Sequence, residues 1–183
     1  MTEVTPSPTE ITAVLSLVHN LERDRLGTGP LAALRRMEPA GALPPAFWQV
    51  LIKHVPEDLR DGPQAERAWA AVVNGIALMA PRSNQQNTKP GAALAATGYS
   101  EPRFVRLLRA EGTGAAAELR TACRWLSTKA QPVDWVLFAR FILSRLHPWF
   151  QGEENQDRQT NSLARAYFAA QAKSAAPSET AQP

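Results

Sequence analysis

The sequence predicts an all-α protein: a compact bundle of about eight helices in two packed halves, with a basic surface. Apolar residues recur at spacings of three and four along most of the chain, which is the period of an amphipathic helix. No segment alternates apolar and polar residues over the length of a strand. Since 44% of the 183 residues are hydrophobic, the helices have enough apolar side chains to bury a core.

The N-terminal helical half is predicted over residues 7–80, after a disordered N-terminus at residues 1–6. Its first helix begins at Ser7, an N-cap followed by proline at the first helical position. Glu10 stands three residues after this N-cap and completes a capping box. Apolar residues then repeat at helical spacing, and the helix is expected to end near Gly27.

Three further helices complete this half. A Gly-Pro step opens the second at residues 30–37, and a Pro-Pro step opens the third at residues 44–55. The fourth is predicted at residues 64–79, where an Ala-Pro step ends it. The segment at residues 81–91, PRSNQQNTKPG, is polar, is bounded by prolines and lacks either period, so it is predicted to be a loop.

The C-terminal basic helical half is predicted over residues 92–173, followed by a disordered tail at residues 174–183. Ser100 is placed as an N-cap, and Asp134 as a cap or first-turn acid, because each precedes an apolar repeat of helical spacing. The segment HPWFQGEENQ interrupts the helices before the last one. The helices of this half are predicted at residues 92–97, about 100–111, 115–127, 134–146 and 157–172.

A row of arginines marks the segment YSEPRFVRLLRAE. At 100° per residue, Arg103, Arg106 and Arg109 fall on one arc of the helical wheel. Phe104 and Leu107 fall on a separate, apolar arc. This helix is therefore expected to pack with one side and to present three guanidinium groups on the other. A solvated face that keeps the protein soluble stays an alternative for a single such helix.

Basic residues gather in the second half of the chain. Between Arg82 and Arg145 there are ten basic and four acidic residues, in a chain with a net charge of +3. Arg120 and Arg124, four residues apart, share a second helix face. The loop adds Lys89 and several hydrogen-bonding side chains, with a mobile linker as its alternative interpretation. Because arginine binds phosphate through a planar, forked group, these residues predict salt-sensitive, sequence-independent binding to a nucleic-acid backbone.

The sequence lacks the patterns of an enzyme or a metal site, and no cofactor or small-molecule substrate is expected. The three histidines stand far apart, and no phosphate-binding loop, dinucleotide fingerprint or nucleophile elbow is present. Cys123, the single cysteine, lies among apolar residues at helical spacing and is predicted to be in the core. No apolar run reaches the length of a membrane span and the N-terminus lacks signal-peptide features, so a cytoplasmic protein without a membrane partner is expected.

Four segments, in this order, resemble a known family: PLAALRRMEPAGALPPAFWQVL, GAALAATGYSEPRFVRLLRAEG, LRTACRWLSTKAQPVDWVLFARFIL and DRQTNSLARAYF. Together they are similar to CasB, the small subunit of the type I-E CRISPR effector complex Cascade. The likeness covers roughly residues 10–170 and depends on the ordered set of segments rather than on any single motif.

The resemblance implies a non-catalytic Cascade subunit that stabilises an R-loop in antiviral defence. Its partners would be the backbone and large subunits of Cascade, a second copy of itself, crRNA and target DNA. Two copies would lie beside the backbone subunits and help to hold the crRNA–target duplex and the displaced strand, while a separate nuclease-helicase would cut the target. Because guide pairing reads the sequence, such a subunit needs to contact only the nucleic-acid backbone.

The resemblance also extends to single positions. The basic positions that match the family are Arg35, Arg36, Arg103, Arg109, Arg124, Arg140 and Arg158. With the clustered residues, the predicted nucleic-acid-binding set is Arg35, Arg36, Arg82, Lys89, Arg103, Arg106, Arg109, Arg120, Arg124, Arg140 and Arg158. The segment at residues 147–157 carries acids that do not suit a nucleic-acid face, and it is expected to contact a protein neighbour instead.

Two other functions stay open at this point. A stand-alone helical DNA-binding regulator would need a recognition helix, and the helix with Arg103 and Arg109 could serve, although the turn TGYSEP before it fits poorly. A purely structural adaptor would instead pair its arginines with acidic partner proteins.

Overall fold

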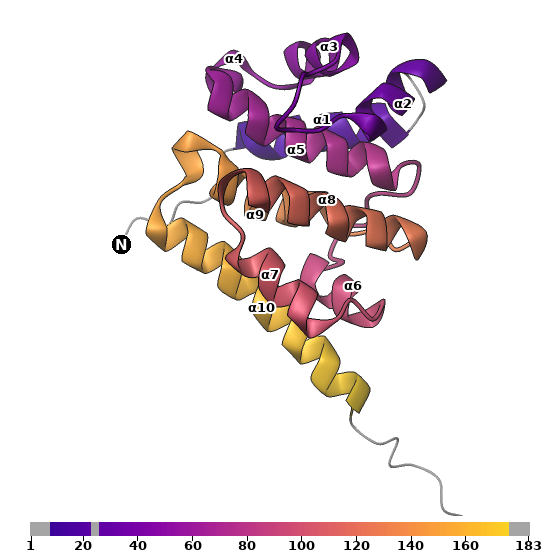
Figure 1. Cartoon of the computed structure of the whole chain (residues 1–183), viewed down its shortest axis with the longest axis vertical. Coiled ribbons are helices and arrows are strands. Elements are labelled where there is room, and N and C mark those ends of the chain that lie inside the picture. The colour runs from indigo at the N-terminus through magenta and orange to yellow at the C-terminus, as the bar shows by residue number, and fades with distance from the viewer. Residues whose placement is uncertain (1–7, 23–25, 176–183) are drawn as a thin grey trace, which may run out of the picture.

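The structure, a computed structural model that describes residues 8–22 and 26–175, confirms the all-α class. These described residues form ten α-helices and one short 3-10 helix, and no β-strand (Figure 1). The helices are α1 (Pro8–Glu22), α2 (Thr28–Arg36), α3 (Pro45–His54), α4 (Glu57–Arg60), α5 (Pro63–Met79), α6 (Pro90–Ala96), α7 (Glu101–Arg109), α8 (Gly112–Thr128), α9 (Trp135–Leu146), η1 (Pro148–Phe150) and α10 (Glu153–Ala175).

The boundaries differ from the prediction mainly in two places. The single turn α4 was not expected, because four residues are too few to show a helical period. α10 begins at Glu153, one turn before the predicted start, and continues to Ala175. Its first turn holds Glu153 and Glu154, whose negative charges are favoured at a helix N-terminus. The Ser7 cap, residues 1–6 and residues 176–183 lie outside the described residues.

α5 lies at the centre of the fold and packs against α1, α2, α8 and α9. Small residues allow its neighbours to approach closely. At Gly75, for example, a Cβ would lie 2.6 Å from Trp135 Cη2 and 3.0 Å from Cys123 Sγ. The hydrophobic core includes Val72 before the 81–91 loop and Phe138 after it. Residues on both sides of the loop therefore belong to the same core. The division of the chain into two halves stays a prediction.

Residues of the 81–91 loop have defined hydrogen-bond partners. The Glu22 carboxylate at the end of α1 accepts hydrogen bonds from the Ser83 amide at 2.7 Å, the Ser83 hydroxyl at 2.7 Å and the Asn84 amide at 2.8 Å. The Val133 amide donates to the Ser83 carbonyl at 3.1 Å. These bonds join the loop to the end of α1 and to the residues that precede α9.

Asp134 connects the same loop to α9. Its carboxylate accepts hydrogen bonds from the amides of Val136 and Leu137, which confirms it as the N-cap of this helix. Its second oxygen accepts from the Asn87 amide at 3.0 Å, and its own amide donates to the Thr88 carbonyl at 2.8 Å. One residue therefore caps a helix and holds the loop.

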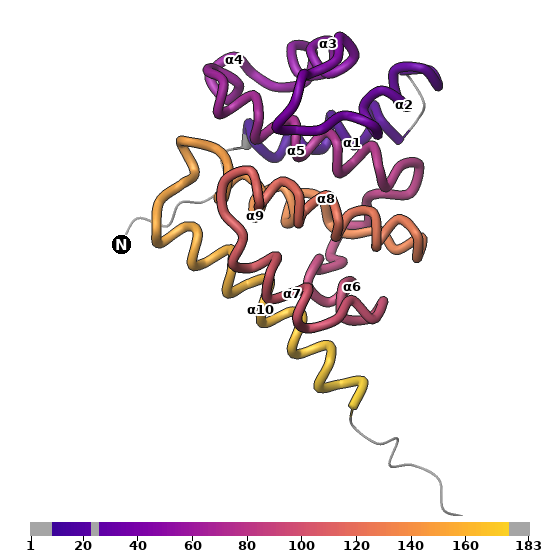
Figure 2. Tube along the Cα trace, viewed as in Figure 1, coloured from indigo at the N-terminus to yellow at the C-terminus, as the bar shows by residue number. Residues whose placement is uncertain are grey.

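α10 is the longest helix and runs along one side of the molecule (Figures 1 and 2). α6 approaches it so closely at Gly91 that a Cβ there would lie 2.1 Å from the Leu163 carbonyl oxygen. The Phe104 ring of α7 stacks on the Tyr167 ring of α10 with centroids 3.8 Å apart. The Tyr167 hydroxyl also donates to the Tyr99 carbonyl at 2.5 Å. These contacts fix both α6 and α7 on α10.

Candidate nucleic-acid interface

The helical wheel of α7 is confirmed by the burial of its side chains. Phe104 and Leu107 are buried in the core, whereas Arg103, Arg106 and Arg109 are exposed. Arginine on this helix thus faces away from the core, as the spacing predicted. We call the exposed cations of α7 and of the following helix and its cap the α7–α8 surface, which comprises Arg103, Arg106, Arg109, Arg124 and Lys129.

One tryptophan ring contacts two of these cations. The Trp125 ring lies 5.7 Å from the Arg103 guanidinium carbon and 5.1 Å from the Lys129 ammonium nitrogen, measured to the ring centroid. The indole N–H donates to the Thr97 hydroxyl at 3.1 Å, and the ring meets Tyr99 edge to face. Since a cation over an indole face is attracted by the ring quadrupole, the ring orients both charges at the surface.

The cations of this surface differ in whether an acid neutralises them. Arg106 lies 3.6 Å from the Glu118 carboxylate. Among the described residues, no carboxylate forms an ion pair with Arg103, Arg109 or Arg124. These three guanidinium groups are therefore exposed and have no acidic partner within the described part of the chain, which suits them to bind an anion.

Two other predicted binding residues make contacts inside the fold. Arg35 donates from Nε to the Ala77 carbonyl at 2.8 Å and from a terminal nitrogen to the Ala80 carbonyl at 3.0 Å, at the end of α5. Arg120 is buried and forms an ion pair with Glu38. These guanidinium groups are engaged by the protein itself.

Arg140 lies in α9 near the first turn of α1. Burial raises the pKa of the Glu10 carboxyl, and the charge of the nearby Arg140 opposes this shift. Arg140 is half-buried, and its charge acts on Glu10 within the fold. Arg36, by contrast, is exposed at the end of α2.

Part of the 81–91 loop is bound within the protein. Ser83 is fully buried, and its hydroxyl donates to Glu22. The backbone N–H groups of Asn84 and Asn87 also donate within the protein. Arg82 stays exposed, beside a shallow hollow that it lines with residues of α5 and α8.

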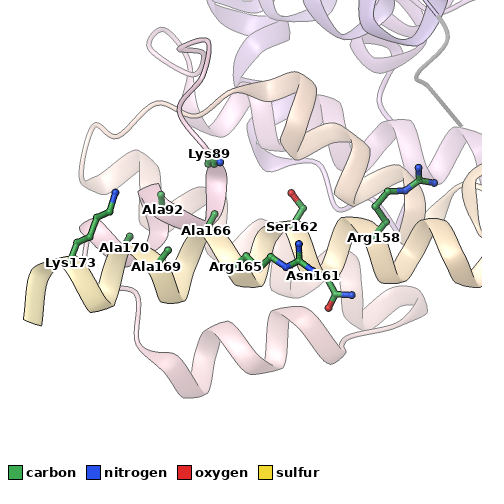
Figure 3. Close-up of a pocket in the computed structure, with 10 residues that line it drawn as sticks. All are labelled: Lys89, Ala92, Arg158, Asn161, Ser162, Arg165, Ala166, Ala169, Ala170 and Lys173. Carbon is green, nitrogen blue, oxygen red and sulfur yellow. The ribbon is translucent and has the colours of Figure 1, made fainter. Parts of the chain in front are cut away.

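Lys89 and Arg158, distant in sequence, line one open groove between α6 and α10 (Figure 3). Its volume is about 740 Å³. We call it the α10 groove. Its lining residues are Lys89, Ala92, Arg158, Asn161, Ser162, Arg165, Ala166, Ala169, Ala170 and Lys173.

Sequence reasoning missed three cations. Arg165 and Lys173 follow Arg158 on α10 at intervals of seven and eight residues, a spacing that keeps them on one helix face. That signal was readable in the sequence. Lys129 gave no such signal, because only the fold brings its ammonium group to the Trp125 ring.

The described residues contain no group of three histidine, cysteine, aspartate or glutamate side chains that could hold a metal ion. Cys123 is buried, which confirms its predicted place in the core, and burial raises the pKa of its thiol to about 12. None of the described helices is long and apolar enough to cross a membrane.

The fold and these surfaces define an all-α protein with exposed basic groups on α7–α8 and on α10. A model of the family of CRISPR-associated protein Cse2 matches residues 30–168, and the chain belongs to this family. The family predicted from the four sequence segments is thereby confirmed. The crystal structure of CasB from Thermobifida fusca matches with a TM-score of 0.64 and 22% sequence identity, over 86% of this chain and 97% of that chain. This likeness shows the fold. No curated protein matches the chain.

Proposed function

We propose that this protein is the non-catalytic small subunit of a type I-E CRISPR Cascade complex in the cytoplasm. It binds the backbone of crRNA, target DNA and the displaced strand, and thereby stabilises the R-loop in antiviral defence. Its protein partners are the backbone and large subunits of Cascade and a second copy of itself. Membership of the Cse2 family supports the assignment to a CRISPR complex.

The observation that carries the binding role is the α7–α8 surface. Arg103, Arg109 and Arg124 are exposed and lack acidic partners among the described residues. Trp125 contacts both Arg103 and Lys129 and restricts their side chains. Part of the entropy cost of ordering these two cations is therefore incurred before an anion binds. A planar guanidinium group can bind a phosphate through two parallel hydrogen bonds.

Contacts of this kind carry affinity without reading bases. Arginine bound to phosphate positions a protein on nucleic acid, whereas hydrogen bonds to base edges supply sequence specificity. In an RNA-guided complex, guide pairing already supplies that specificity. A small subunit that contacts only the backbone therefore suits the task.

The test is a salt titration of target binding by the assembled complex with Arg103→Ala, Arg109→Ala and Arg124→Ala combined. Removal of three phosphate contacts is expected to lower the slope of log K against log salt by about 2–3 units. Discrimination between matched and mismatched targets should change less than affinity. Lys53→Ala, at an exposed cation of α3, is the control and should leave the slope unchanged.

A thermal melt of each variant separates binding from folding. The three arginines are exposed, so each substitution should change stability by no more than about 0.5 kcal/mol. If the slope of log K against log salt and the thermal unfolding transition are both unchanged, the α7–α8 surface contacts water and not nucleic acid. If the complex with the three substitutions keeps its affinity for nucleic acid but loses a protein subunit, the structural adaptor would be favoured.

A further inference from the structure

The α10 groove is a basic surface that the α7–α8 surface does not include. Figure 3 shows Arg158, Arg165 and Lys173 projecting from α10, about two helical turns apart, with Lys89 at the start of α6 nearby. Fifteen residues separate Arg158 from Lys173, which at 1.5 Å per residue places their backbones about 22 Å apart along the helix. The groove is thus long enough to follow an extended ligand.

The groove lies on the other side of α10 from α7. At 100° per residue, Arg158 and Arg165 lie about 20° apart around the helix and both lie roughly opposite Tyr167. Tyr167 is the residue that stacks on Phe104 of α7. Because α10 itself stands between them, a ligand in the groove does not occupy the contacts that α7 offers.

The charges of the groove have one sign. Its lining residues include four cations and no acid. None of the four cations forms an ion pair with a carboxylate of the described chain. The Nε atom of Arg158 is buried and has no hydrogen-bond partner there. Three unpaired cations on α10 and Lys89 beside them repel one another, and an anionic ligand would relieve that repulsion.

The floor of the groove indicates which part of a polyanion it fits. Ala92, Ala166, Ala169 and Ala170 form much of the lining, and no aromatic side chain is among the lining residues. Proteins that hold the bases of a single strand stack them on aromatic rings, so this groove lacks a platform for bases. Small side chains beside cations and the polar Asn161 instead allow close approach of a sugar-phosphate backbone.

We propose that the α10 groove is a second track for a nucleic-acid strand, which lies with its phosphates toward the groove and its bases toward solvent. The proposal deepens the proposed function, on which it rests, by giving the subunit two backbone tracks separated by α10. Two tracks on one protein would hold two strands apart. Once one strand is bound in its track, the partner strand is kept close to the other track, which raises its effective concentration there.

The test is a salt titration of the full-length chain with a long single-stranded DNA oligonucleotide, by fluorescence anisotropy. Arg165→Ala combined with Lys173→Ala removes two contacts and is expected to lower the salt slope by about 1.4 units. The matched control, Arg165→Lys with Lys173→Arg, keeps both charges and should keep the slope. Combination with the three α7–α8 substitutions should give the sum of the two losses, because the surfaces do not share contacts.

A crosslink locates the strand. Ala169→Cys places a thiol in the groove, and the native Cys123 does not compete because it is buried with a pKa of about 12. A photo-crosslinker on residue 169 is expected to attach to the DNA oligonucleotide. Gln49→Cys, at an exposed position of α3, is the control and should not crosslink.

The outcomes separate the two proposals. A slope that falls only for the α7–α8 substitutions, without a crosslink at residue 169, would overturn the second track and leave the proposed function intact. Slopes that do not change for either set would overturn both. In the assembled complex, a crosslink from residue 169 to a protein subunit instead of DNA would show that the groove takes an acidic protein, and would also overturn the second track.

Discussion

Arg35 and Arg36 are neighbours in sequence and equally basic, yet the fold gives them different tasks. Arg35 reaches across to two carbonyls at the end of α5, where four carbonyl groups of a helix lack partners within it. A guanidinium group satisfies two of them and its charge suits the negative end of the helix dipole. Arg36 is exposed. A basic pair in the sequence thus divides between packing and surface.

Substitution of each residue separates these tasks. Arg35→Ala is expected to lower the free energy of unfolding by about 1.5–3 kcal/mol, because hydrogen bonds from a charged donor are lost and two carbonyls are left unsatisfied. Arg36→Ala should change it by no more than about 0.5 kcal/mol. Urea unfolding followed by circular dichroism measures both. Equal effects of the two substitutions would contradict the assignment.

His147 is expected to make the stability of the protein depend on pH. Its Nε2–H donates to the Leu59 carbonyl at 2.8 Å, and its Nδ1 accepts from the Trp149 amide at 3.2 Å, so both ring nitrogens are used by the neutral form. Burial lowers the pKa of His147, and the hydrogen bond to Leu59 opposes this. Protonation at Nδ1 would place two donors face to face.

The sign of the effect follows from the lowered pKa. Below the unfolded value of 6.5, the unfolded chain binds a proton that the folded protein resists, so stability is lost as pH falls through and below this value. The loss due to His147 can reach about 1.4 kcal/mol per pH unit. His147→Gln keeps a donor and an acceptor and should flatten the profile. Burial also lowers the pKa of His54, so His54→Gln is measured beside it; an unchanged profile in His147→Gln would contradict the prediction.

At the scale of elements, the spacing of residues predicted helices well but their contacts poorly. The wheel of α7 was correct because three arginines and several apolar residues agree on one period. The loop at residues 81–91 was harder to predict, since its polar side chains could bind either phosphates or other parts of the protein. Its partners, Glu22 and Val133, come from distant parts of the sequence. Helical period carries no information on such pairings.

The contact of α6 with α10 depends on a residue that the sequence did not single out. At Gly91 a Cβ would lie 2.1 Å from the Leu163 carbonyl oxygen and 2.9 Å from the Tyr167 amide nitrogen. Both are backbone atoms of a packed helix, so they cannot move aside as the end of a flexible side chain can. α6 can thus lie this close to α10 only with glycine at position 91.

Gly91→Ala is expected to push α6 from α10 and to lower the free energy of unfolding by about 1–3 kcal/mol. Gly114→Ala is the matched control, because Gly114 lies in the first turn of α8 and a Cβ there would have nothing within 4 Å. There alanine should stabilise the helix by up to about 1 kcal/mol. Chemical denaturation measures both, and a neutral Gly91→Ala would show that the helices separate easily.

For the whole molecule, composition and period were enough for the all-α class, and the ordered segments were enough for the family. They were not enough to show which arginines are exposed and which make contacts within the protein. Arg120 and Arg124 share a face by spacing, yet Arg120 is buried against Glu38 and Arg124 is exposed. Burial depends on which helix lies opposite, and that is a property of the assembled core rather than of one helix.

The shared core also bears on whether the protein unfolds in one transition or in two. Residues 7–80 and 92–173 were predicted as two halves, and α5 of the first packs against α8 and α9 of the second. The side chains of Trp69 in α5 and Trp135 in α9 are both fully buried in the same cluster. A fragment without α8 and α9 would expose much of α5 to water, so the first half alone is expected to lack part of its core.

We therefore expect a single cooperative unfolding transition. Far-ultraviolet circular dichroism, which reports all helices, and tryptophan fluorescence, which reports buried rings on both sides of the loop, should give coincident curves in urea. Gly91→Ala, which perturbs α10, should move both curves together. Two transitions, or a fluorescence change that precedes the loss of helix, would show that the halves unfold independently and that contacts of α5 with α8 and α9 contribute little.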